Sequence, residues 1–267
     1  MISMLRGSLA PILKAAVIGG AITMGAGQAH AVTFGSVADP ASARAASAEF
    51  VISGDVLTIT LANAGTGDAR SRTDVLTGLF FEISMASGTR LRPVSAMLAG
   101  GSSVIYDPDG QPVDGDVGGE WAFKGNLSGA PGAATNGLSA ASLRGLFRRA
   151  NFSGPNLSGD TRVGGIDYGL LSTADNEATG RALAASGGLI KNAVVFTLIG
   201  ASNIVSEITN VSFQYGHRTS GPNLAGQANL ATSRVGATVP LPAALPLLAA
   251  ALGVFGLLGY RRRRSGI

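Results

Sequence analysis

Near the end of the sequence, a run of seventeen residues from Ala244 to Tyr260 contains no charged side chain. Together with Ala243, an α-helix over this run spans roughly 27 Å, just enough to cross the hydrocarbon core of a bilayer. Four consecutive arginines follow it directly: Arg261, Arg262, Arg263 and Arg264. Each would cost about 3 kcal/mol near the bilayer centre, so the cluster should stop transfer and stay cytoplasmic. The run therefore predicts a transmembrane helix over 244–260.

The residues in front of this helix are Val239, Pro240, Leu241, Pro242 and Ala243. The two prolines lack an amide donor and hold the chain extended, as a peptide-cutting enzyme at the membrane surface would need. The predicted order is the motif outside the membrane, the helix across it and the arginines inside. A plain C-terminal anchor with a proline-rich lead-in is the alternative interpretation.

Motif, apolar run and arginine cluster together resemble the PEP-CTERM class of sorting signals, most closely its V-P-L-P-A variant. Such tails occur on exosortase-dependent surface proteins of Gram-negative bacteria. The resemblance covers residues 239–267 and implies recognition by the exosortase, a membrane-embedded cysteine peptidase. It further implies a β-rich secreted domain that is released or transferred to the cell surface or extracellular matrix. Leu241 stands where the commoner motif has Glu, which leaves open which exosortase would act.

Residues 1–31 have the features of a secretory signal peptide. Arg6 and Lys14 supply the positive region, an apolar, glycine-rich stretch follows, and Ala29 and Ala31 form an A-x-A cleavage site. An uncleaved anchor is the less favoured alternative, because the apolar core is short. The chain is therefore predicted to consist of three segments: a signal peptide over 1–31, an exported domain over 32–238 and the sorting signal over 239–267.

The charge of the chain changes once its end segments are set aside. The whole chain has 20 basic and 16 acidic residues, but six of the basic residues lie in the end segments. Residues 32–238 therefore hold fourteen basic and sixteen acidic residues, a net charge of −2. The basic pI reflects targeting, and no nucleic-acid partner is predicted. The absence of cysteine excludes a disulfide framework, so this domain must be stabilised by packing.

Short runs rich in β-branched and aromatic residues predict strands in the middle of the chain. They cover 49–53, 56–62, 75–84, 91–98, 103–106, 119–123, 193–199 and 208–215. Gly54-Asp55 joins the first two in a predicted hairpin. The frequent turns predict an all-β fold, an antiparallel sandwich of jelly-roll or immunoglobulin-like type. An N-terminal signal helix and the C-terminal transmembrane helix would flank it. One short helix is also considered over 139–150, with Arg144 and Arg148 on a solvated face.

An acidic stretch suggests a ligand site. It contains Asp107, Asp109, Asp114, Asp116 and Glu120. Oxygen ligands on a glycine-rich loop suit Ca²⁺, although the spacing fits no EF-hand register and a solvated turn is the favoured interpretation. Zinc is poorly supported, because without cysteine and with one histidine left after signal cleavage the usual zinc ligand sets cannot be filled, and no other cofactor is predicted. The neighbouring aromatic residues Tyr106, Trp121 and Phe123 suggest either a sugar-stacking platform or, preferably, core residues.

Catalysis receives little support from the sequence. A nucleophile needs a nearby base, yet only His217 remains after signal cleavage, and no G-x-S-x-G motif occurs. The favoured function is an exported, non-catalytic surface or matrix protein for cell-surface architecture, adhesion or biofilm matrix. Its predicted partners are an exosortase, the inner membrane before processing, and exopolysaccharide or other matrix components. The alternative is a secreted polysaccharide-active enzyme or carbohydrate-binding protein that uses the loop from Asp107 to Glu120.

Overall fold

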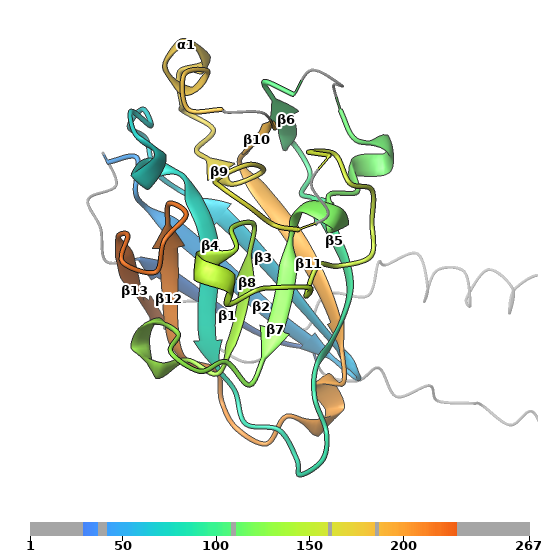
Figure 1. The fold of residues 1–267 in the computed structure, drawn as a ribbon. Helices are drawn as coiled ribbons and strands as arrows, with labels where there is room; N and C mark the ends of the chain where they lie inside the picture. Colours follow the sequence, from blue (N-terminus) through green and yellow to red (C-terminus); the bar gives the residue numbers. More distant parts are fainter. Residues whose placement is uncertain (1–28, 37–41, 108–110, 160–161, 185–186, 229–267) are drawn as a thin grey trace, which may run out of the picture.

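The computed structural model describes residues 29–36, 42–107, 111–159, 162–184 and 187–228. Its strands are β1 (His30–Ser36), β2 (Ala46–Ser53), β3 (Val56–Asn63), β4 (Leu76–Glu82), β5 (Arg92–Leu98), β6 (Ser103–Ile105), β7 (Ala122–Gly125), β8 (Asn136–Ser139), β9 (Leu170–Leu171), β10 (Leu189–Lys191), β11 (Ala193–Ile199), β12 (Thr209–Tyr215) and β13 (Asn223–Ala228). The helical parts are short: α1 (Glu177–Gly180) and the 3-10 turns η1 (Arg72–Asp74), η2 (Val113–Gly115), η3 (Gly118–Glu120), η4 (Pro131–Ala133), η5 (Leu143–Gly145) and η6 (Ala201–Asn203). The predicted all-β class is confirmed (Figure 1).

The strands join into one sheet in the order β5-β11-β3-β2-β1-β13-β12-β4-β9-β10-β6, with β8 paired to β4 and β7 paired to β8. Among the described strands, only β9 and β10 pair in parallel. The predicted sandwich would consist of two separate sheets. Here β1 pairs with both β2 and β13, so a single sheet curves round a shared core.

Aromatic contacts show that distant parts of this sheet face each other. Phe50 on β2 packs edge-on against Phe81 on β4 with 5.2 Å between ring centroids, although three strands separate β2 from β4 in the sheet order. Phe50 also packs edge-on against Phe34 on β1 at 5.7 Å. Apolar side chains from both halves of the curved sheet therefore fill one core.

The predicted hairpin is confirmed by β2 and β3, which pair from Ala46↔Asn63 to Ser53↔Val56. Gly54 has a φ of 59° at the first turn position, a backbone conformation that glycine adopts without a steric penalty. On β3, Leu57, Ile59 and Leu61 are fully buried, as the alternation of apolar and polar residues predicts.

The strand predicted over 75–84 is confirmed by β4, which is buried on both faces. Phe81 faces the main core, whereas Phe80 packs against Phe147 on the opposite face at a centroid distance of 6.0 Å. The segment that carries Phe147 therefore covers the outer face of β4. This segment contains η5 and not the short helix considered over 139–150. Leu143 and Arg144 have positive φ values of 43° and 60°, which an α-helix does not allow.

Most residues of the predicted targeting segments lie outside the described part of the chain. These are most of the signal segment, the motif from Val239 to Ala243, the predicted transmembrane helix and the arginine cluster. Within the described ranges, no helix has the length and apolar character needed to span a membrane. Of the predicted cleavage site, Ala31 lies in β1 and pairs with Val51. Cleavage after Ala31 would still leave β1 paired to β2 from Val32 onward, because Val32 pairs with Phe50.

Candidate functional site

The residues of the acidic stretch take part in separate local interactions. Asp107 accepts a hydrogen bond from the Tyr168 hydroxyl at 2.7 Å, and Asp116 accepts one from the Gly118 amide at 2.8 Å. Asp114 lies in η2, and Asp109 lies outside the described residues. No group of three or more histidine or acidic side chains that could hold a metal ion is found in the described ranges. Calcium binding at this loop stays a prediction.

Glu120, the last residue of this set, is directed into the protein. Its side chain is 3% exposed, and its Oε1 accepts hydrogen bonds from the amides of Leu157 at 2.6 Å and Ser158 at 2.9 Å. Burial raises the pKa of the Glu120 carboxyl above its ordinary value, although these amide donors act in the opposite direction. Glu120 therefore anchors the segment that follows Pro155 to η3.

The aromatic residues beside the loop do not form a sugar-stacking platform. Trp121 is fully buried and packs edge-on against Phe196 with 5.0 Å between ring centroids. Phe123 is only 6% exposed, and the Tyr106 hydroxyl donates to the Glu177 carbonyl at 2.6 Å. The core interpretation is therefore correct for Trp121 and Phe123.

We expect Glu120→Gln to weaken the pH dependence of stability. Because the folded-state pKa of Glu120 is raised, its stabilising contribution is present below the unfolded pKa of about 4.3 and is lost as the pH rises through the folded pKa. Glutamine does not titrate, and its Oε1 can keep both amide hydrogen bonds. The melting temperature of the variant relative to the wild type should therefore rise between pH 4 and pH 7.

Melting curves followed by circular dichroism across this pH range would measure the effect. Glu49→Gln is the matched control, because it makes the same substitution at an exposed position on β2. If the melting temperatures of Glu120→Gln and the wild type changed in parallel with pH, the raised pKa of the Glu120 carboxyl would be contradicted.

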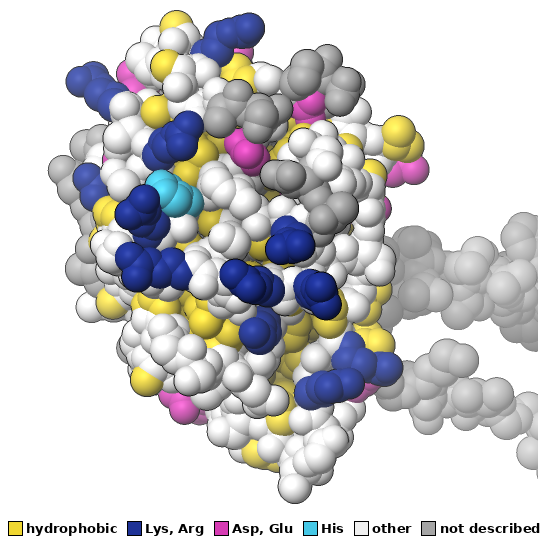
Figure 2. Space-filling model, in the orientation of Figure 1, with side chains coloured by type: hydrophobic (Ala, Val, Ile, Leu, Met, Phe, Trp, Pro, Cys, Tyr) yellow, Lys and Arg dark blue, Asp and Glu magenta, His cyan; other side chains and the backbone are white. Residues whose placement is uncertain are grey.

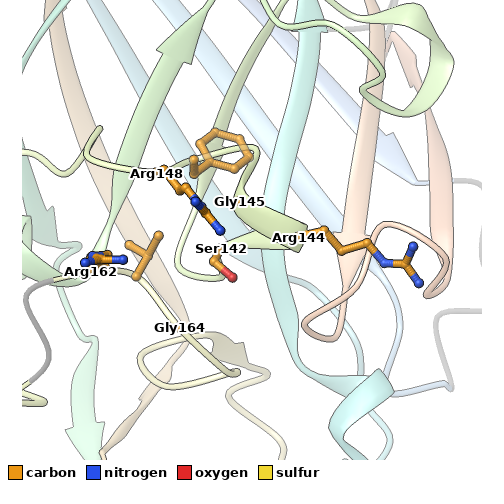
Figure 3. Close-up of a pocket in the computed structure, with 8 residues that line it drawn as sticks. Ser142, Arg144, Gly145, Arg148, Arg162 and Gly164 are labelled. Carbon is orange, nitrogen blue, oxygen red and sulfur yellow. The ribbon is translucent and has the colours of Figure 1, made fainter.

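Two hollows on the surface are lined by cationic side chains. The first has a volume of about 560 Å³ and is lined by Ser142, Arg144, Gly145, Phe147, Arg148, Arg162, Val163 and Gly164 (Figure 3). The second, of about 1010 Å³, lies between the 83–93 segment and β7, and its cationic lining residues are Arg90, Arg92, Lys124, Arg148 and Arg149. Arg148 lines both hollows, and no acidic residue lines either. We call these two hollows the basic groove.

Segments far apart in the sequence build the basic groove. Arg92 begins β5, Lys124 lies on β7, and Arg144 lies in η5. The Lys124 ammonium donates to the Leu146 carbonyl at 3.0 Å and so ties β7 to the segment after η5. Figure 2 shows lysine and arginine side chains gathered across this face of the molecule.

The Arg148 side chain lies close to Gly145. A Cβ atom built on Gly145 would lie 2.7 Å from Arg148 Nε, and Gly145 has a φ of 86°. Glycine at this position therefore both allows the turn and leaves room for the arginine side chain. In Figure 3, Arg148 lies between Arg144 and Arg162.

The cations of the groove are not neutralised by described carboxylates. The ion pairs found among the described residues lie elsewhere: Arg44 with Asp74 at 3.2 Å, and Lys191 with Glu177 at 3.5 Å. The six arginines of the groove are all exposed. The arrangement can therefore bind anionic groups without first breaking an ion pair to those carboxylates.

This site was not predicted from the sequence. Arg144 and Arg148 were expected on a solvated helix face, and the net charge of −2 over residues 32–238 does not indicate a basic surface. The doublet Arg148-Arg149 is a local sequence feature that can mark an interaction face, but a solvated helix face was the favoured interpretation. Comparison with known proteins yields no match to a family model, a curated protein or a solved structure.

Proposed function

We propose that this chain is an exported, non-catalytic cell-surface or extracellular-matrix protein that carries a C-terminal exosortase sorting signal of the PEP-CTERM class. Residues 1–31 would be removed as a signal peptide, and residues 32–238 would form the exported domain. The helix over 244–260 would hold the chain in the inner membrane until the exosortase acts at the motif from Val239 to Ala243. The mature protein would then serve in surface architecture, adhesion or biofilm matrix.

The position of the folded strands carries this proposal. Among the described residues, the strands begin at His30 and end at Ala228, eleven residues before Val239. The first and last strands are hydrogen-bonded neighbours, with Phe34 opposite Ala228. The core of the described residues is thus formed by strands from β1 to β13, and only the first two residues of β1 overlap the predicted signal segment. Removal of both segments would leave the sheet order unchanged.

The basic groove favours a binding function over the enzymatic alternative. A glycosidase of the usual kind needs two carboxyl groups on either side of the sugar chain. The groove instead has only cationic and neutral lining residues, and Glu120 from the acidic stretch is buried against backbone amides. These observations support a function in which the protein binds an anionic component of the cell surface or matrix.

Intact-mass measurement tests the proposed processing. In the native host, we expect the protein recovered from the cell surface or medium to begin at Val32 and to lack the tail. In a strain without the exosortase, the tail should be retained. Replacing both Pro240 and Pro242 with alanine should also cause retention, whereas the neighbouring Thr238→Ala should be processed normally. A mature protein that keeps its tail in the native host would contradict the sorting proposal.

A further inference from the structure

We propose that the basic groove binds a linear acidic polysaccharide whose carboxylates pair with its arginines. This inference rests on the proposed export, since it identifies the class of matrix component that the domain holds. The seven cations concerned are Arg90, Arg92, Lys124, Arg144, Arg148, Arg149 and Arg162. They are half of the fourteen basic residues between 32 and 238, in a segment whose net charge is negative. Their concentration along two hollows that share Arg148 is therefore a local feature and not the result of a generally basic surface.

The exposure of these cations favours a polymer over a small anion. An exposed ion pair strengthens association by no more than about fivefold, because water and salt screen it. A small carboxylate that reaches two arginines would therefore bind very weakly. A chain with regularly spaced carboxylates can contact both hollows at once and add several such contributions. Planar guanidinium groups also suit carboxylates, because they can donate two parallel hydrogen bonds.

The neutral lining favours sugar over nucleic acid. Asn126, Thr135 and Asn136 line the second hollow, and Ser142 lines the first. Amide and hydroxyl groups of this kind can bind sugar hydroxyls. Proteins that bind single-stranded nucleic acid usually offer aromatic rings on which bases stack. The rings that line the groove are those of Phe123 and Phe147, which are 6% and 0% exposed and cannot serve in this way.

Arg148 should contribute most, because it is the residue that both hollows share. Its neighbour Arg149 lines the second hollow and is also exposed. Reversing both charges would place two negative groups at the junction, where a bound chain must pass. The double variant Arg148→Glu/Arg149→Glu therefore tests the path of the polymer. Arg70→Glu/Arg72→Glu is a matched control, because it makes the same charge change at two exposed arginines outside both hollows.

The experiment measures binding of the full-length chain, in a non-ionic detergent, to immobilised polygalacturonate and alginate. We expect saturable binding to at least one of the two, no binding to neutral dextran, and a more than tenfold loss of affinity between 0.05 and 0.5 M salt. The Arg148→Glu/Arg149→Glu variant should bind at least tenfold more weakly, whereas the control variant should stay within about twofold of the wild type. Should the first variant fail to fold, Arg144→Glu/Arg162→Glu replaces it with the same expectation.

Three results would overturn the inference. They are absence of binding to both polyuronates, equal weakening by the groove and control variants, and equal or tighter binding to duplex DNA at the same salt with the same dependence on Arg148 and Arg149. The last result would assign the groove to nucleic acid. Because binding is measured on the purified chain, its failure is distinguishable from a failure of processing, which the intact masses report.

Discussion

Replacing Phe50 with alanine is expected to lower the free energy of unfolding by about 3 to 5 kcal/mol. The Phe50 ring is fully buried and contacts rings on two other strands, Phe34 on β1 and Phe81 on β4. The contact with Phe81 joins parts of the sheet that are not hydrogen-bonded neighbours. Loss of the ring would therefore remove buried apolar surface and leave a cavity between the two halves of the curved sheet.

Urea denaturation would measure this loss, and thermal unfolding should show a melting temperature lower by about 6 to 20 °C for a domain of this size. Val113→Ala is the control, because Val113 is 81% exposed and its truncation should change stability by less than about 0.5 kcal/mol. A loss below about 1.5 kcal/mol for Phe50→Ala would mean that the two halves of the sheet do not depend on this contact.

The second large effect is expected for Gly119→Ala, which should lower the free energy of unfolding by about 3 kcal/mol. A Cβ atom on Gly119 would lie 2.0 Å from the carbonyl oxygen of Pro155, which is backbone and cannot rotate away. Relief of this clash requires movement of the segment after Pro155. That segment supplies the amides of Leu157 and Ser158 to the buried Glu120 carboxyl, so the same movement would also disturb those hydrogen bonds.

Gly100→Ala is the matched control for this experiment. A Cβ atom on Gly100 would meet nothing within 4 Å, and its φ lies outside the left-handed region. Urea unfolding of both variants should show a loss for Gly119→Ala and a change within about 0.5 kcal/mol for Gly100→Ala. Equal stabilities for the two variants would show that the Pro155 segment adapts without cost.

The sequence predicts those strands whose side chains alternate strongly or are continuously apolar. β3 and β4 belong to this class, as does β11, whose predicted range matches its observed range. β1 was missed because its first residues overlap the predicted signal cleavage site. β13 (Asn223–Ala228) was missed because it contains no β-branched or aromatic residue. It forms a strand because it pairs with β1 on one side and β12 on the other, a tertiary effect that local composition does not reveal.

The basic groove could not be predicted for a related reason. Its cations come from positions as far apart as Arg90 and Arg162, and only the fold of β5, β7 and η5 brings them to one surface. The acidic stretch shows the reverse case. Its carboxylates are neighbours in the sequence, yet Asp107 and Asp116 have separate hydrogen-bond donors in the structure. Closeness in the sequence therefore did not predict which charged side chains lie together in the structure.

The pairing of β13 also has a mechanical consequence. Any tension applied through the chain beyond Ala228 reaches the domain first through β13. This strand has three residues paired with β1 and three paired with β12, far fewer than the eight pairs that join β2 to β3. The short ladders on either side of β13 would therefore part before the hairpin of β2 and β3. Under such tension, a domain built in this way yields at β13 while its best-paired strands stay joined.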